Sequence, residues 1–237
     1  MNPFKDASRY YVEYDLGEIR KDYRPRELAL HQKDAVTKLG GWYATRSEAG
    51  RGGILVLPTG GGKTFTAVHF ACTQPLSDGA KVLWLAHTHH LLEQAFESFA
   101  GSAVSVLEPK SQLRIRLISG MGGEHFPIHS VKPTDDVLIS SLPTACRGFQ
   151  QGHPALLSFL EASGGNLLVV FDEAHHAPAP SYRNFLRELR LRYPKVLLLG
   201  LTATPTYGDS KSLGWLSELL DSLRIRSDFV DCGDGTQ

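Results

Sequence analysis

The chain has 237 residues, of which 42% are hydrophobic and 21% are charged, so it can bury one substantial core. Lysine plus arginine and aspartate plus glutamate both total 25. This balance excludes anion binding that depends on the overall charge of the protein rather than on a local patch.

The cysteines and the apolar segments bear on where the protein works. Cys72, Cys146 and Cys232 are widely spaced and show no CxxC pattern, which argues against a disulfide framework and indicates a reducing compartment. No apolar run approaches the roughly 20 residues of a membrane span, and the first eleven residues lack the apolar core of a signal peptide. These features predict a soluble, cytoplasmic protein with no membrane partner.

Short apolar runs alternate with amphipathic stretches along the whole chain. In chain order, the pattern predicts a helix over 27–45, a strand over 53–58, a helix over 63–73, a strand over 81–87, a helix over 90–99, strands over 103–109, 113–119 and 136–141, a helix over 155–162, a strand over 166–173, a helix over 181–192, a strand over 195–204 and a helix over 212–223. Loops are expected at 49–53, 120–133 and 233–237, which are rich in Gly, Pro or polar residues.

The strands indicate the fold class. Their apolar runs are continuous rather than alternating, which is typical of parallel strands that are covered on both faces. We therefore expect an α/β fold with a mostly parallel central sheet and helices on both faces.

The stretch "VLPTGGGKTF" lies where a predicted strand ends and a predicted helix begins. The first N–H groups of a helix have no partner within the helix, and its dipole is positive at this end. Gly60, Gly61 and Gly62 permit a close approach of the backbone, Lys63 can reach the β- and γ-phosphates, and the Thr64 hydroxyl can bind magnesium. Although the usual pattern has glycine at the position of Leu57, the stretch predicts a phosphate-binding loop.

A pair of carboxylates ends another predicted strand, in "LLVVFDEAHH". The carboxyl ends of the strands are where open α/β sheets bind their ligands. Asp172 would hold magnesium, and Glu173 would orient and deprotonate the water that attacks the γ-phosphate. Together with the glycine loop, this pair predicts hydrolysis of a nucleoside triphosphate.

The order "LPTGGGKT", "DEAH" and "LTATP" resembles the first RecA-like motor domain of superfamily two helicases and translocases, a P-loop NTPase fold. "LAHTHHLLEQA" resembles motif Ia of this family, and the pairing of this stretch with "FDEAHHAPAPSYRNFL" is closest to the type III restriction subunit branch. The first loop of this family often begins with Ala or Leu, which fits Leu57. The resemblance implies an N-terminal extension over 1–25, a RecA-like domain over 26–222 and the start of a connection to a second domain over 223–237.

The resemblance also implies roles for individual residues. In the ATP site, Gln32 would contact adenine, Thr59 would join the three glycines around the phosphates, and His175 would act with Lys63 and the acidic pair. The implied contacts to the nucleic-acid backbone are His87, Thr88, His89, Gly122, Ser141 and Thr144. Thr202 and Thr204 would couple the two sites. The implied cofactors are ATP and Mg²⁺, and the implied polymer is DNA ahead of RNA.

Members of this family carry a second RecA-like domain whose arginine reaches the γ-phosphate. The resemblance therefore implies that this chain is the ATP-binding half of a motor and is weakly active until a second domain is supplied. Two alternatives remain open at this point. A nucleotide-dependent P-loop switch would share the glycine loop and the acidic pair, and a structural domain would keep the site only as a relic.

Overall fold

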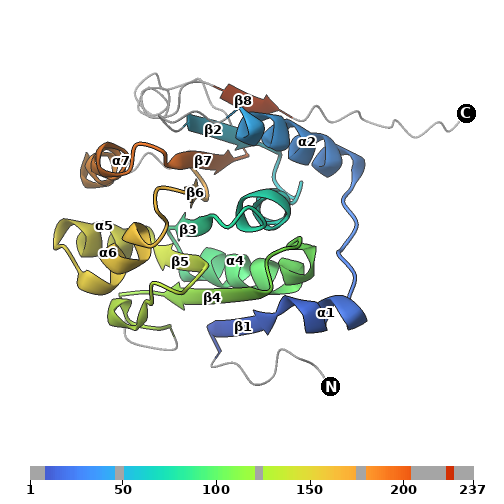
Figure 1. The fold of residues 1–237 in the computed structure, drawn as a ribbon. Coiled ribbons are helices and arrows are strands. Elements are labelled where there is room, and N and C mark those ends of the chain that lie inside the picture. The colour runs from blue at the N-terminus through green and yellow to red at the C-terminus, as the bar shows by residue number, and fades with distance from the viewer. Residues whose placement is uncertain (1–8, 46–50, 121–124, 175–179, 204–222, 227–237) are drawn as a thin grey trace, which may run out of the picture.

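The computed structural model describes residues 9–45, 51–120, 125–174, 180–203 and 223–226, which form a three-layer arrangement (Figure 1). The strands are β1 (Tyr11–Asp15), β2 (Arg51–Val56), β3 (Lys81–Ala86), β4 (Gln112–Ile118), β5 (Val137–Ser141), β6 (Leu167–Phe171), β7 (Leu197–Thr202) and β8 (Leu223–Arg226). The α-helices are α1 (Leu16–Asp22), α2 (Leu30–Ala44), α3 (Lys63–Ala71), α4 (His89–Ser102), α5 (Leu142–Gln150), α6 (Pro154–Glu161) and α7 (Pro180–Arg192).

The eight strands of the described residues form one sheet in the order β1-β4-β5-β3-β6-β7-β2-β8. Every neighbouring pair is parallel except β1 and β4, which are antiparallel. In Figure 1 the sheet lies between a layer with α2 and α4 and a layer with α5, α6 and α7. The predicted α/β fold with a mostly parallel sheet and helices on both faces is confirmed.

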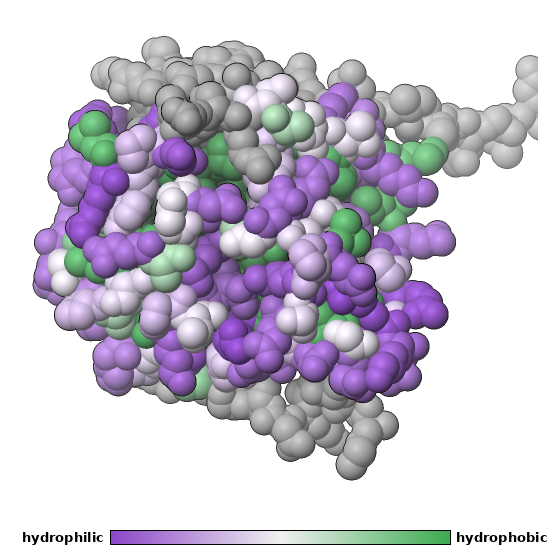
Figure 2. Space-filling model, in the orientation of Figure 1, coloured by the Kyte–Doolittle hydropathy of each residue, from purple (hydrophilic) through white to green (hydrophobic). Residues whose placement is uncertain are grey.

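The central strands are buried on both faces, as their apolar runs predict. In β3, Val82 and Trp84 pack into the cluster under α2, α3 and α4, whereas Leu83 and Leu85 pack into the cluster under α5, α6 and α7. This alternation follows from the two-residue period of a strand. By contrast, Figure 2 shows that the visible face of the molecule is covered mostly by hydrophilic residues.

The helix α4 illustrates how the sequence defines an element. Thr88 caps its N-terminus by accepting a hydrogen bond from the N–H of Leu91 at 3.4 Å. The residues Leu92, Ala95 and Phe99 recur at helical spacing and are buried. Phe99 packs edge-on against Trp84 with ring centroids 5.5 Å apart, which fixes the helix on the sheet.

The predicted strand over 103–109 is wrong. Helix α4 continues to Ser102, and Ala103–Ser105 form a 3-10 turn. The reason is that Ala103 and Val106 are buried against the core as the end of a helical segment, and a short apolar run does not distinguish a strand from such a segment.

Five further elements differ from the sequence prediction. The loop expected at 49–53 ends at Arg51, where β2 begins, and a Cβ atom on Gly53 would lie only 3.2 Å from Trp42, so glycine here serves packing rather than a turn. Elements β1, α1 and α5 were not predicted. The helix expected over 212–223 falls outside the described residues except for Leu223, which begins β8 instead.

Within the described part of the chain, no helix is both long enough and apolar enough to cross a membrane.

Candidate nucleotide-binding site

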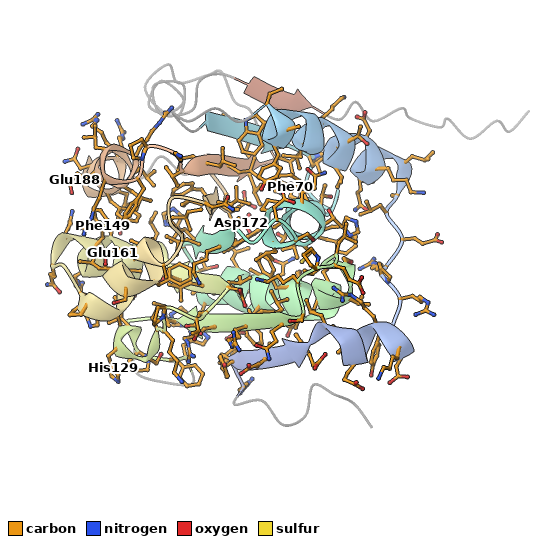
Figure 3. All side chains as sticks on the ribbon, in the orientation of Figure 1. Phe70, His129, Phe149, Glu161, Asp172 and Glu188 are labelled. Carbon is orange, nitrogen blue, oxygen red and sulfur yellow. The ribbon has the colours of Figure 1, made fainter. Side chains whose placement is uncertain are left out.

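Two loops meet at the carboxyl rim of the sheet. Strands β2 and β6 are both parallel to β7, which lies between them, so the segments that follow them emerge at the same rim. The Thr64 hydroxyl donates to Oδ2 of Asp172 at 3.3 Å, and Nζ of Lys63 lies 3.5 Å from Oε1 of Glu173. In Figure 3, Asp172 is labelled beside the turquoise helix α3. The lysine loop and the acidic pair therefore form one cluster.

The glycine loop has the backbone geometry that its sequence suggests. Gly60 and Gly62 have φ angles of 80° and 74°, in the left-handed region that glycine adopts without strain. Gly62 is the N-cap of α3, and no described side chain caps this helix end. The loop therefore presents the positive end of α3 toward the acidic pair.

Gln32 and His31 hold the loop from α2. Gln32 Nε2 donates to the carbonyl oxygen of Gly61 at 3.3 Å, and His31 Nε2 lies 3.1 Å from the same oxygen. The other side of the Gln32 amide accepts from the N–H of Ala29 at 3.0 Å. Gln32 thus supports the loop directly, and its contact with adenine stays a prediction.

Leu57 stands where the usual pattern has glycine, and the structure gives the reason that a side chain is accommodated. Leu57 is fully buried in the core, and its N–H donates to the carbonyl of Thr202 at 3.2 Å. The residue completes the sheet ladder rather than approaching a ligand. The close approach to the loop begins at Gly60.

Asp172 is 3% exposed. Burial, followed by the charge of Glu173, raises the pKa of Asp172 to about 6, while the N–H of Glu173, Lys63 and the Thr64 hydroxyl act in the opposite direction. A carboxylate with this pKa is mostly ionised at neutral pH, yet its charge is costly to keep in the folded protein.

We expect that the substitution Asp172→Asn raises the free energy of unfolding by about 2–3 kcal/mol above pH 7. The Asp172 carboxyl takes up its proton at a higher pH in the folded protein than in the unfolded chain. The stability of the wild type therefore falls as the pH rises from 3.8 to about 6. The stability advantage of asparagine grows over the same pH range. Urea unfolding between pH 4 and pH 8 measures this difference. Asp34→Asn, on the exposed side of α2 in an ion pair with Lys38, is the control, and an equal gain at pH 4 and pH 8 would contradict the interpretation.

Glu173 has an unusual backbone. Its φ angle is 55°, and it is the one non-glycine residue with positive φ among the described residues. Such a conformation costs of order 1 kcal/mol and persists where the surrounding structure imposes it. At this position, two residues after the end of the buried strand β6, the Glu173 carboxylate lies 3.5 Å from Lys63.

The residues expected to contact nucleic acid lie along the same rim. His87 and Thr88 follow β3, and His89 begins α4 with its ring 4.8 Å from the ring of His125. Ser141 ends β5 and donates its hydroxyl to Oγ1 of Thr144 at 2.7 Å. Since β3 adjoins β6 and β5 adjoins β3 on its other side, this group lies on the rim next to the acidic pair, on the side away from the phosphate loop.

Thr202 lies between the two loops at the end of β7 and is 1% exposed. The Thr202 carbonyl accepts the hydrogen bond from Leu57 described above. The carbonyl of the preceding residue, Leu201, accepts a hydrogen bond from the N–H of Ala174 at 2.7 Å. The end of β7 therefore touches both loops. The other predicted residues His175, Gly122 and Thr204 lie outside the described residues.

A cavity of about 560 Å³ opens beside the loop, within the size range of small-ligand sites. Its lining residues are Arg26, Gly60, Gly62, Lys63, Thr64, Phe65, Leu91, Gln94, Glu97, Ser98, Gly101, Ser102 and Glu173. Sequence reasoning missed Arg26, Phe65 and the face of α4. The helical spacing of the α4 residues is visible in the sequence, but nothing in it indicates that this face borders the glycine loop.

Comparison with known proteins shows the family of the chain. The family model described as type III restriction enzyme, res subunit, matches residues 26–207, well over half of the chain. The chain belongs to this family. It is thus a RecA-like domain of the superfamily two helicases, of the type III restriction subunit kind, as the sequence resemblance predicted.

Individual relatives agree with this family. The protein named "Putative helicase 22" of Sulfolobus islandicus filamentous virus (isolate Iceland/Hveragerdi) is 28% identical over 232 residues, which cover 98% of this chain and 36% of that protein. The antiviral innate immune response receptor RIG-I of Homo sapiens is 25% identical over 189 residues, 73% of this chain and 19% of the receptor. The chain thus spans little more than a third of the viral relative and less of the receptor.

Solved structures share the fold of this family member. The Hef helicase domain of Pyrococcus furiosus matches with a TM-score of 0.56 and 26% identity, over 80% of this chain and 37% of that one. The SWI2/SNF2 ATPase core of Sulfolobus solfataricus, solved in complex with double-stranded DNA, matches with a TM-score of 0.55 and 16% identity, over 83% of this chain and 36% of that one. At that identity, the second likeness concerns the fold alone.

Proposed function

We propose that this domain binds Mg-ATP between the glycine loop and the acidic pair and serves as the ATP-binding half of a nucleic-acid-dependent motor. The observation that carries the proposal is the joint contact of Thr64 with Asp172 and of Lys63 with Glu173 across β7. A helicase-type ATPase is the activity expected from membership in the family.

The residues present fit a magnesium-bound triphosphate. The Thr64 hydroxyl and the Asp172 carboxylate are oxygen donors of the kind that Mg²⁺ prefers, and they already lie 3.3 Å apart. Magnesium would neutralise charge on the phosphates when it is bound. Lys63 and the first-turn N–H groups of α3 would hold the phosphate oxygens.

Glu173 is the group suited to position the attacking water. Its carboxylate is paired with Lys63 at 3.5 Å. A bound triphosphate would attract Lys63 and weaken this pair, so the Glu173 carboxylate would become available to accept a proton from water. Binding of the substrate would thus prepare the base.

The nucleic-acid half of the proposal rests on the rim residues next to the acidic pair. His87, Thr88, His89, Ser141 and Thr144 lie at the ends of β3 and β5, where backbone phosphates would meet helix N-termini and hydroxyl groups without reading the sequence. DNA is proposed ahead of RNA. A second RecA-like domain, in the same chain or another one, would complete the motor, and without it hydrolysis would be slow.

Lys63→Ala tests the nucleotide half. Because a hydrogen bond to a charged group contributes about 1.5–3 kcal/mol, the loss of Lys63 is expected to weaken Mg-ATP binding by roughly a hundredfold. Calorimetric titration of the purified chain measures the dissociation constant. Lys38→Ala, an exposed lysine paired with Asp34 on α2, is the control.

The same titration separates the proposal from its alternatives. Failure of the wild-type chain to bind Mg-ATP would point to a relic site. Mg-ATP binding that is coupled to neither DNA nor RNA would favour a nucleotide-dependent switch, because a motor must link the two ligands.

A further inference from the structure

The carbonyl oxygen of Gly61 is the point at which helix α2 holds the phosphate loop. His31 Nε2 lies 3.1 Å from this oxygen, and Gln32 Nε2 lies 3.3 Å from it. A carbonyl oxygen only accepts hydrogen bonds, so His31 is a donor here and its Nε2 carries a proton. Two neighbouring side chains of α2 therefore turn the Gly61 carbonyl toward that helix.

The same peptide group carries the N–H of Gly62. Among the described residues the cis peptide bond is Glu108–Pro109, so this peptide is trans, and its C=O and N–H point in opposite directions. Gly62 lines the cavity, whereas Gly61 is buried and neither it nor any described residue of α2 lines the cavity. The Gly62 N–H thus points away from α2, on the side of the cavity, and no described residue accepts a hydrogen bond from it.

The orientation of this peptide decides which atom a bound triphosphate meets. In the observed orientation, the phosphate oxygens meet an N–H donor one residue before Lys63. In the reversed orientation they would meet a carbonyl oxygen, which repels them. Because glycines flank the peptide on both sides, no side chain opposes the reversal. The hydrogen bonds from α2 therefore set the orientation.

We propose that His31 is a positioning residue of the phosphate loop, which keeps the Gly61 carbonyl turned toward α2 and so presents the Gly62 N–H to the triphosphate. This role rests on the proposed function, because it requires the loop to hold phosphates. Gln32 donates to the same oxygen, so each donor can replace the other. The predicted contact of Gln32 with adenine would compete for its amide, and His31 would then hold the loop.

The test uses magnesium tripolyphosphate as the calorimetric ligand, because it has no adenine and reports on the loop without the base. In a Gln32→Leu background, His31→Phe is expected to raise the dissociation constant by roughly tenfold or more, the effect of losing one hydrogen bond to a charged group. In the wild-type background the same substitution is expected to cost about threefold or less, since Gln32 still holds the carbonyl.

Two side chains at position 31 separate the hydrogen bond from packing. Phenylalanine keeps an aromatic ring and removes the donor, whereas glutamine loses the ring and keeps an N–H donor at a similar reach. In the Gln32→Leu background, His31→Gln is therefore expected to bind tripolyphosphate as tightly as its parent. In the wild-type chain the two substitutions are expected to keep this order with a smaller spread, so the result does not depend on the folding of the double variants.

His129→Phe is the matched control. His129 is an exposed histidine in the turn Ile128–Ser130, and Figure 3 shows it at the edge of the molecule, away from Asp172. This variant is expected to keep the wild-type dissociation constant.

Two results would overturn the role of His31 alone, provided that the wild-type chain binds tripolyphosphate. One is an equal weakening by His31→Phe and His31→Gln, which would assign the effect to packing of the ring. The other is unchanged binding when His31→Phe is added to Gln32→Leu. If the wild-type chain did not bind tripolyphosphate, the phosphate site itself would be refuted, and the role of His31 with it.

Discussion

Glu173→Gln is expected to lower the rate of ATP hydrolysis by about 10²–10⁴-fold, the usual contribution of a positioned general base, with little change in Mg-ATP affinity. Glutamine keeps the length of the side chain, and it bears the same backbone strain at a φ of 55°. It cannot accept the proton of the attacking water. The substitution therefore separates binding from the proposed proton transfer.

Single-turnover hydrolysis, with the chain in excess over ATP, measures this rate even where the isolated domain is slow. Glu161→Gln supplies the control for loss of a glutamate charge far from the site. A hydrolysis rate equal to that of the wild type would remove Glu173 from the mechanism.

Arg116→Leu is expected to lower the free energy of unfolding by about 3–5 kcal/mol, because it leaves a buried charge without compensation. Arg116 is 4% exposed and Asp135 is fully buried. The guanidinium donates from Nε to Oδ2 of Asp135 at 2.7 Å and from Nη2 to Oδ1 at 3.1 Å. This ion pair ties β4 to the turn before β5.

Denaturant unfolding of single and double variants measures the coupling. Adding Asp135→Asn to Arg116→Leu is expected to recover part of the loss, since the stranded charge is then removed. Arg192→Leu, which breaks the exposed pair with Glu161, is expected to cost less than about 1 kcal/mol. Equal losses for the buried and the exposed pair would contradict the argument.

The central strands could be predicted from the sequence because they are buried on both faces and therefore appear as continuous apolar runs, as in β3 and β6. The elements at the edge of the sheet were predicted less well. Strand β1 has an alternating pattern in which Val12 and Tyr14 are buried, so a signal was present. Helix α5 begins with the N-cap Ser141 and has a proline in its first turn, so a signal for a helix start was present there too.

The same division holds for the site. The glycine loop and the acidic pair could be predicted because both have residue patterns that are typical of phosphate and magnesium binding. Both also follow strands, and parallel strands bring their carboxyl ends to one rim of the sheet. The cavity wall could not be predicted. Whether α4 borders the cavity depends on how it packs beside α3, and the sequence gives the face of α4 but not its neighbour.

The position of β7 has a mechanical consequence. Because one hydrogen-bonded strand stands between β2 and β6, the backbones that carry the lysine loop and the acidic pair are held about two strand spacings apart, or roughly 10 Å. Side-chain substitutions in β7 can tilt or loosen this strand but cannot shorten the distance between the backbones of β2 and β6. The separation of the two backbones is thus set by peptide geometry, and only the side chains that reach across it can change the distance between their functional groups.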